Sequence, residues 1–469
     1  MEATSNNFRE SLLKNSVKEH GHKHLNVMAV NAYKDLAKLN VPGMKDDEWR
    51  FLDLTSLSGH EFAPSGKEPV TSEKLEQVKK LFLTDTIRIV LVNGYYSAEL
   101  SDLSKLNKSL QTSLPNVDSS VKHEDDINIK VQNFFTTLNQ SFFAEELCLN
   151  VVDELAEKIH LLHVNVAKTT ANPSHVPTAN IEFSSGDGLS VASKTVELSS
   201  GVVGATSKVV GFSSEVGLSQ SSGVSYPRTK VVINKNCQAT LIEEYISFEN
   251  EVSLTNSVTE IILKEDARIS HSVVERIAKS AFYISHSHVA VAQNATYDGT
   301  VIVHGGRLSR SDIRIDLNAV QARANLNGLS LINGRQISDI KTIIKHNAPN
   351  CRSNQLHKSI VAGGAHSIFN GKICVAEGAA GTEAHQQNKS LMLSTKARIT
   401  TEPKLEINND DVVCTHGATI SQIDEDILFF FKSRGIDQVE ATKLCVNAFL
   451  HEIISKIPAV EIQKSFLKN

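Results

Sequence analysis

The amino-acid sequence predicts a mainly β protein with helical regions at both ends. Between residues 228 and 402 the chain consists of short β-rich runs separated by Asn, Gly and Asp, and Pro349 is the only proline in that interval. Many short strands joined by polar turns are typical of a closed or coiled all-β structure. The runs continue for about 170 residues without a gap, which favours a β-solenoid over a barrel because each added rung buries the face of its neighbour.

The N-terminal region has a mixed pattern. Apolar residues recur at three- and four-residue intervals over residues 5–41, which predicts helix, and Pro42 with Gly43 ends that pattern. The run IRIVLVNGYYS at 87–97 predicts a strand followed by a turn. Residues 130–147 predict a further helix.

A stretch rich in Ser, Gly and Val, with almost no aromatic residues, interrupts the chain before the β-rich region. We interpret it as an insertion that forms a flexible surface excursion. Extra short strands are the alternative, because Val alternates with small polar residues. The predicted organisation is therefore an N-terminal helical and mixed region (1–170), the insert (171–226), a β-solenoid core (227–418) and a C-terminal helical region (419–469).

Helical signals return at the C-terminus. A short helix is predicted from Asp424 to Ser433, and Gly435 suits a C-terminal stop. Asp437 and Glu440 have the spacing of an N-terminal capping pair. The following helix is predicted to end at Pro458 and to place five apolar residues on one face, namely Val439, Val446, Phe449, Ile453 and Ile457.

Composition excludes several functional classes. A chain of 469 residues suggests two or three structural units, and its 22% charged residues are typical of a globular protein. The formal net charge of −5 argues against a nucleic-acid-binding protein. We find neither a secretory signal nor an apolar run long enough to span a membrane. The six cysteines are dispersed without a C-x-x-C pair, which favours a reducing, cytoplasmic compartment.

Cys414 and His416 are the strongest candidates for chemistry. Alternate side chains of a strand lie on one face, so this thiol and this imidazole should point the same way. Tetrahedral metal sites usually need four ligands, so missing partners would come from elsewhere in the fold or from another chain. The simpler interpretation is a pair of packed side chains on a solenoid strand.

Other motifs are weaker. The histidines in EHGHKHL (His20, His22 and His24) have no supporting Cys or carboxylate cluster, so a solvated turn is favoured over a metal site. His286 and His288 share a strand face, and we interpret it as a polar face of the solenoid. The pairs Gly305-Gly306 and Gly363-Gly364 are not followed by the Lys of a phosphate-binding loop and are predicted to be turns.

Three consecutive aromatic residues, Phe429, Phe430 and Phe431, lie in the predicted short helix ahead of Arg434. Consecutive helical residues point in different directions, so one core face cannot bury all three. Either one of them contacts another protein, as aromatic residues at interface centres do, or the helix is buried on all sides. Trp49 and Arg50 are expected to pack the N-terminal helices against neighbouring elements, and we assign them no catalytic role.

Two segments resemble the SufD members of the SufB/SufD family, scaffold subunits of the SUF iron–sulfur cluster assembly system. They are LEINNDDVVCTHGAT, followed by IDEDILFFFKSRGI, and KDDEWRFLDL at Lys45–Leu54. The Cys414-x-His416-Gly417 pattern favours SufD, because SufB chains have a His-Glu-Ala run at this place. Segments between them also look like the family: YPRTKVVINKNCQATLIEEYISF, LTNSVTEIILKEDARISHSVVE and FNGKICVAEGAAGTEAHQQNKSLMLS.

The resemblance implies a right-handed parallel β-helix flanked by helical regions, and a non-catalytic scaffold that forms a heterodimer with a SufB-like subunit. It implies that Cys414 and His416 face SufB near the place where a transient, shared iron–sulfur cluster forms, and possible iron ligation by both. It also implies that a SufC-like ABC ATPase docks on the C-terminal helices, for which Phe429–Phe431 and Arg434 are the candidates. Ser421 departs from the family's usual glycine, and the insert is a second departure.

Three alternatives remain open from the sequence. A SufB-like primary scaffold would take up a cluster by itself. A β-solenoid carbohydrate-active enzyme would need clustered carboxylates and is usually secreted. A plain structural adaptor would need neither Cys414 nor His416.

Overall fold

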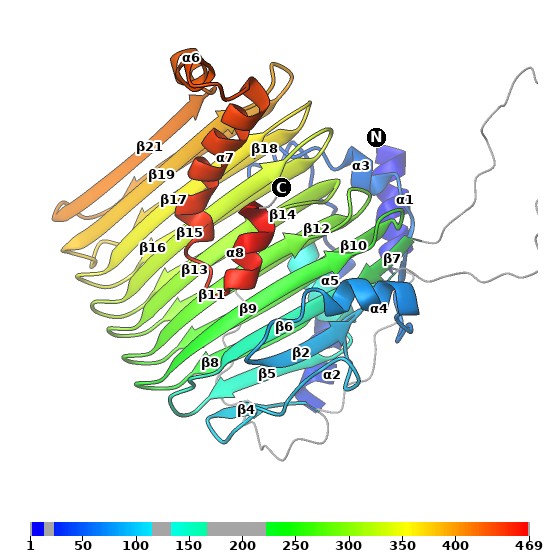
Figure 1. Ribbon diagram of the computed structural model, residues 1–469. Coiled ribbons are helices and arrows are strands. Elements are labelled where there is room, and N and C mark those ends of the chain that lie inside the picture. The colour runs from blue at the N-terminus through cyan, green and yellow to red at the C-terminus, as the bar shows by residue number, and fades with distance from the viewer. Residues whose placement is uncertain (1, 14–22, 115–132, 167–221, 468–469) are drawn as a thin grey trace, which may run out of the picture. The chain divides into compact units, whose positions relative to one another are not determined.

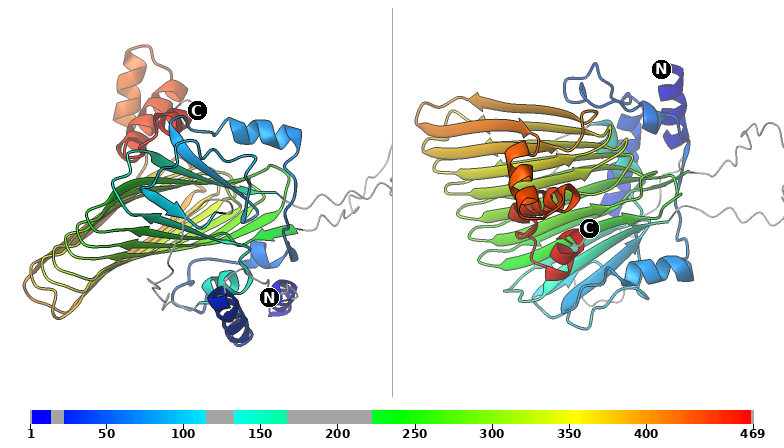
Figure 2. Two further views of the ribbon diagram at one scale, coloured as in Figure 1. Left: turned by 90° about the horizontal axis from the view of Figure 1, so that it is seen from below. Right: turned by 45° about the horizontal axis from the view of Figure 1, so that its top comes forward.

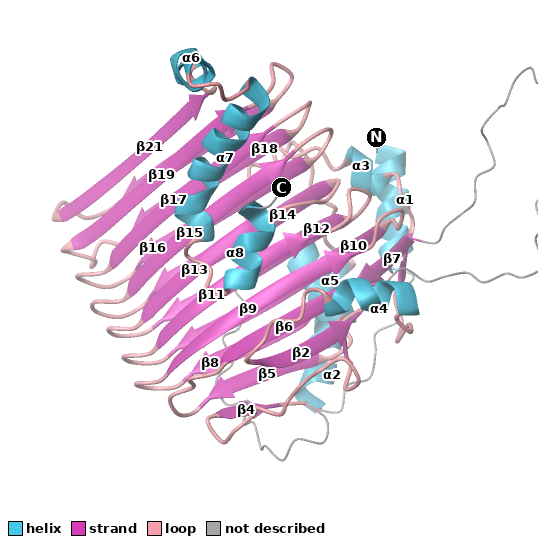
Figure 3. Cartoon of the chain, in the orientation of Figure 1, coloured by secondary structure: helices cyan, strands magenta, loops and turns pink. Residues whose placement is uncertain are grey.

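The core of the protein is a parallel β-helix (Figure 1). The computed structural model describes residues 2–13, 23–114, 133–166 and 222–467. From β8 onward, consecutive strands alternate between two sheets, and each strand pairs in parallel with the strands one rung before and after it. The prediction of a β-solenoid with helical regions at both ends is confirmed, as the secondary-structure colours show (Figure 3).

Two sheets form the walls of the β-helix, and they are called sheet A and sheet B below. Sheet A contains β20 (Arg398–Ile407), β18 (His366–Val375), β16 (Ile337–His346), β14 (Leu308–Leu317), β12 (Phe282–Val291), β10 (Ser253–Leu263), β8 (Arg228–Ile233), β5 (Glu146–Val151) and β4 (Leu110–Thr112), with β1 (Phe62–Pro64) and β7 (Ser222–Ser225) beside them. Sheet B contains β21 (Val412–Ser421), β19 (Thr382–Met392), β17 (Arg352–Val361), β15 (Arg323–Ile332), β13 (Thr296–Val303), β11 (Arg268–Arg276), β9 (Gln238–Ser247), β6 (Lys158–Asn165), β2 (Thr86–Val92) and β3 (Tyr95–Tyr96).

Strands of the N-terminal region belong to the same β-helix. β5 pairs with β8 and β6 pairs with β9, both in parallel. The β-helix therefore begins ahead of residue 227, where the sequence analysis places its start. The strand predicted at 87–97 is present as β2 and β3, whereas only part of 130–147 is helical, because Glu146 already begins β5. Most of the predicted insert lies outside the described residues.

The turns from sheet A to sheet B explain the Asn, Asp and Gly punctuation of the sequence. The turns from β8–β9 to β18–β19 each hold one residue in the left-handed region, such as Asn294 with φ of 56° and Asn350 with φ of 57°, and Asn, Asp and Gly tolerate this conformation best. The backbone N–H of the turn residue also donates to a carbonyl of the next turn, as from Asn294 to Val320 at 3.1 Å. The turns therefore stack as regularly as the strands.

The N-terminal helices α1 (Glu2–Leu13), α2 (Lys23–Leu36), α3 (Thr55–Ser58) and α5 (Phe134–Phe142) pack with the outer face of sheet A in one apolar cluster, and α4 (Ser72–Lys79) packs near the first rungs of sheet B. Trp49 is central to the first contact. Its ring lies 5.3 Å from that of Phe135, and the guanidinium of buried Arg310 lies 3.8 Å from its centroid.

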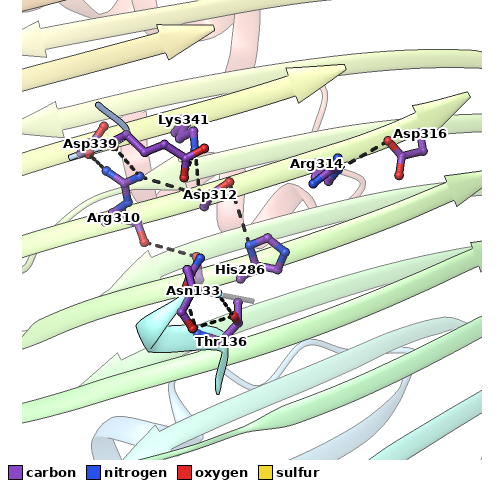
Figure 4. A network of polar contacts seen from close by, with 11 residues as sticks. Asn133, Thr136, His286, Arg310, Asp312, Arg314, Asp316, Asp339 and Lys341 are labelled. Atoms are coloured by element: carbon purple, nitrogen blue, oxygen red, sulfur yellow. Dashed lines mark hydrogen bonds and ion pairs between the residues drawn. The ribbon is translucent and has the colours of Figure 1, made fainter. Parts of the chain in front are cut away.

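A charged network surrounds Arg310 on sheet A (Figure 4). Arg310 pairs with Asp339, and Lys341 lies 3.4 Å from Asp312 and 2.9 Å from Glu48. Buried charges cost free energy unless they are paired. The network therefore depends on the N-terminal segment, which supplies the Glu48 carboxylate that pairs with Lys341.

The C-terminal helices lie on the other side of the β-helix from the N-terminal helices (Figure 2). They are α6 (Glu425–Ser433), α7 (Gln438–Ile454) and α8 (Val460–Leu467). Ile453 and Ile457 are buried against sheet B as predicted, but Val439 is exposed because the first turn of α7 extends beyond the sheet contact. No helix among the described residues is long and apolar enough to cross a membrane.

We expect Trp49→Ala to lower the free energy of unfolding by about 3–5 kcal/mol, because it removes a buried indole and exposes the Arg310 guanidinium beneath it. Urea unfolding followed by circular dichroism measures the change. Trp49→Phe, which keeps an aromatic ring over the cation, should be intermediate. A loss below about 1 kcal/mol for the alanine variant would contradict the packing role.

Acid should destabilise the protein through buried histidines such as His346. Burial lowers the pKa of His346 to about 4, from about 6.5 in the unfolded chain. Between these two pKa values the unfolded state binds a proton that the folded state does not. The contribution of His346 to the free energy of unfolding is therefore fully present above about pH 6.5, and about 3 kcal/mol of it is lost as the pH falls to about 4. His346→Gln should show a shallower loss of unfolding free energy over this range; an unchanged pH profile would refute the assignment.

Candidate functional site

The β-helix ends at an open rung formed by β20 and β21. Within the described chain, β20 pairs only with β18 and β21 pairs only with β19, so each has one edge without a strand neighbour (Figure 1). Three exposed apolar side chains lie on these two strands: Ile407, Val413 and Ile420. Unpaired backbone groups beside apolar side chains make an edge suited to pairing with another chain.

Cys414 and His416 lie on β21 and face the lumen at this open end. In the strand register, Cys414 is opposite Ala384 and His416 is opposite Gln386, and both of these β19 residues are buried inside the β-helix. Thr415 points the other way and contacts His385 at 2.8 Å on the outer face. The two side chains therefore share a face, as their spacing predicts.

Their environments differ. Cys414 is half-buried and packs against Ala384 in a small apolar cluster at the mouth of the lumen, whereas His416 is exposed. Burial raises the pKa of the Cys414 thiol, with a small opposing effect from a hydrogen bond with the backbone at Ala384. The thiol form therefore dominates at neutral pH, and a soft metal ion would have to displace its proton.

The described part of the chain does not complete a metal site around this pair. No group of three or more His, Cys, Asp or Glu side chains in metal-binding arrangement lies among the described residues. The other five cysteines form no disulfide and lie elsewhere: Cys148, Cys237, Cys351, Cys374 and Cys445. Cys414 and His416 thus offer two donors of the four that a tetrahedral site needs.

Helix α6, directly after β21, carries exposed aromatic side chains. Phe429 is 71% exposed and Phe430 is 51% exposed, while Phe431 is partly buried. Arg434 stacks on Phe430 with its guanidinium 3.8 Å from the ring centroid. Asp424, predicted as the first helical residue, is instead the N-cap of α6, and Gly435, with φ of 80°, follows the end of the helix as predicted. Since α6 has no buried residue, burial on all sides is excluded.

The remaining histidine candidates have charged neighbours or lie outside the description. His288 contacts Asp316 at 2.8 Å, whereas buried His286 lies 3.9 Å from Asp312 with no hydrogen bond from either ring nitrogen among the described residues. Both histidines lie on the outer face of sheet A among charged residues, in agreement with a polar face of the solenoid. Two of the three clustered N-terminal histidines, His20 among them, fall outside the described residues, and the side chain of the third is not described.

Sequence reasoning missed the lumen-facing Gln386 and the exposed edge residue Val413. Val413 had no signal in the sequence, because its exposure follows from the position of β21 at the end of the sheet. The signal for Gln386 lay in Gly371, an inward-facing glycine within a strand, which often marks close approach of another group.

Comparisons with known proteins give a consistent picture. Residues 216–449 match the family model described as "SUF system FeS cluster assembly, SufBD core domain". The chain is 30% identical over 445 residues to an iron-sulfur cluster assembly SufBD family protein of Synechocystis, covering 91% of this chain and 86% of the relative.

Two further relatives agree. Identity to the iron-sulfur cluster assembly protein SufD of Escherichia coli is 24% over 421 residues, covering 90% of this chain and 86% of the relative. Identity to the chloroplastic protein ABCI7 of Arabidopsis thaliana is 31% over 256 residues, covering 54% of each. With its parallel β-helix and a match along nearly its whole length, the chain belongs to the SufBD family of the SUF iron–sulfur cluster assembly system.

Proposed function

We propose that this chain is a SufD-like, non-catalytic scaffold subunit that pairs with a SufB-like subunit through β20 and β21. The observation that carries this proposal is the open rung, which presents Cys414 and His416 at the mouth of the lumen as half of a ligand set. The chain supplies one part of a cluster-assembly site, and the partner supplies the remainder.

Edge pairing is the physical basis of the heterodimer. A second β-helix that adds strands to β20 and β21 would satisfy their free backbone N–H and C=O groups. Docking would also cover Ile407, Val413 and Ile420, which lie exposed at that edge. Burial of these side chains provides a hydrophobic contribution to the interface in addition to the backbone hydrogen bonds.

The chemistry of the pair suits a nascent iron–sulfur cluster as cargo. Thiolate is a soft ligand for iron and imidazole is a borderline one. Docking of the partner would exclude water from Cys414 and His416 and so strengthen metal–ligand electrostatics. A site shared between two chains can also open when they move apart, which suits transient assembly followed by release.

The ATPase partner is assigned to the C-terminal helices. The sequence has no phosphate-binding loop, so ATP hydrolysis would come from a SufC-like subunit. Phe429 and Phe430, with Arg434 stacked against the second ring, form an exposed aromatic surface of the kind found at interface centres. Because α6 follows β21 directly, a force applied there would reach the strand that carries Cys414.

Assignment as the SufD-like rather than the SufB-like subunit rests on Gly417. SufB-like chains carry a glutamate at this place, which would add a third donor beside the histidine. Anaerobic reconstitution of the isolated chain distinguishes the two roles: little cluster uptake alone is expected here, and robust uptake would favour the SufB-like assignment.

The paired variant, a double substitution of Cys414→Ala and His416→Ala in one chain, should abolish or strongly reduce cluster assembly by the complex. Binding of the SufB-like subunit should persist, because the backbone edges of β20 and β21 are unchanged. Cluster formation is measured by absorption spectroscopy after co-purification of the three subunits. Cys374→Ala, which removes another half-buried thiol on the outer face of sheet A, is the matched control. Unimpaired assembly by the paired variant would leave only the structural-adaptor role.

Replacing Phe429 and Phe430 by Ala should weaken binding of the ATPase subunit at least about 30-fold, the loss of about 2 kcal/mol typical of an aromatic hot spot. Isothermal titration calorimetry with the purified ATPase provides the measurement. Val320→Ala, at an exposed apolar residue in the turn between β14 and β15, should leave the affinity unchanged. Equal affinities for both variants would remove α6 from the interface.

A further inference from the structure

Buried polar side chains line the lumen of the β-helix beneath Cys414 and His416. Deeper in the lumen the polar side chains hydrogen-bond to one another, as Ser309 does to Glu275 and His271 to Tyr297. In the rungs nearest the open end, β17 and β19 direct four buried polar side chains inward: Gln355, His357, Gln386 and Asn388. A polar interior is costly for folding, so its place directly under the candidate site calls for an explanation.

Gln386 is one of two such residues whose polar atoms are all unpaired. Gln386 is only 1% exposed, yet neither its Oε1 nor its Nε2 has a hydrogen-bond partner among the residues that the structure describes, and the same holds for the ring nitrogens of His357 one rung deeper. Buried amides are nearly always paired with protein groups, water or ligand. An apolar residue of similar size at this position would avoid the desolvation cost, so stability does not account for glutamine here.

The opposite wall of the lumen makes room for this amide. Gly371 occupies an inward-facing position on β18 between Phe369 and Ile373, and a Cβ atom there would overlap the Gln386 amide. Glycine within a strand loses packing and costs chain entropy. The sheet therefore gives up a side chain where the amide of Gln386 lies, as it also does at Gly328, where a Cβ atom would overlap the His357 ring.

The strand register places Gln386 next to the candidate site. Gln386 is paired with His416, one rung below it, and adjacent strands are separated by about 4.8 Å. Ala384, on the same inward face, is likewise paired with Cys414 and has too small a side chain to fill the space. Since β21 is the last strand of sheet B in the described chain, Gln386 lies in the rung directly beneath the pair.

We propose that Gln386 is a ligand-binding residue of the shared site, whose amide N–H donates a hydrogen bond to the sulfur held at Cys414. This inference rests on the proposed function. A neutral amide adds no charge, and a hydrogen bond to thiolate or sulfide stabilises the anionic sulfur and tunes its metal. The unpaired amide is thus kept free in the separate chain for a ligand that arrives when the two β-helices meet.

The test uses the complex of the full chain with its SufB-like and ATPase subunits and Co²⁺ as the probe, because thiolate-bound Co²⁺ has a charge-transfer absorption band. Gln386→Met keeps the size of the side chain and removes the amide. The unfolding midpoint should be unchanged or raised, while Co²⁺ affinity falls at least about tenfold and the band shifts to lower energy, as expected when a charge-assisted hydrogen bond to the thiolate is lost.

Gln355→Met is the matched control, because Gln355 lies in the same inward column one rung deeper. It should leave both the affinity and the band unchanged; if it causes the same loss, general packing of the lumen is responsible and the inference fails. Gly371→Ala displaces the amide without removing it, so it should reproduce the loss of Co²⁺ affinity. If Gln386→Met does not fold, the result for Gly371→Ala decides whether Gln386 has the proposed role.

Cys414→Ala separates the inference from the function on which it rests. If this variant eliminates the band while Gln386→Met behaves as the unmodified complex, the role of Gln386 is refuted and the shared site stands. If Cys414→Ala retains the band, the metal is bound elsewhere, and the proposed function and the inference both fall.

Discussion

The parallel pairing of each strand with the strands one rung before and after it is the constraint on which this structure depends. It aligns residues into columns, so that the position of one side chain determines the face occupied by its neighbours through the whole β-helix. The same rule must fail at the last rung, where β20 and β21 have no further strand to pair with. The stability of the interior and the exposure of the end therefore have one cause.

Exposure at this end explains why Cys414 and His416 occupy an intermediate environment. One rung deeper, their column neighbours Ala384 and Gln386 are buried, whereas the last rung leaves the thiol half-buried and the imidazole exposed. A second β-helix that continued the sheets would turn the mouth of the lumen into an interior. The site proposed here is thus created by the same pairing that builds the core.

The outer faces of the two sheets have distinct roles. Sheet A carries the N-terminal helices, fastened through Trp49 over Arg310, and the neighbouring Arg50 forms an ion pair with Glu402 on the last strand of that sheet. Sheet B carries α7 and α8 and leaves α6 exposed beside the end of β21. Both terminal regions therefore contact or adjoin the open rung, and a partner bound to either would act on the strands that carry the site.

The sequence alone determined the solenoid, the helical ends, the glycine after α6, the Asp437 cap of α7, and the shared face of Cys414 and His416, because periodicity, turn residues and alternation are local properties of the chain. The tertiary structure decided that this face is the lumen at its open end, that Phe429 is exposed, and that the amide of Gln386 lies against Gly371. These features depend on contacts between residues far apart in sequence or on different walls of the β-helix, and no local pattern specifies which strand will be the last.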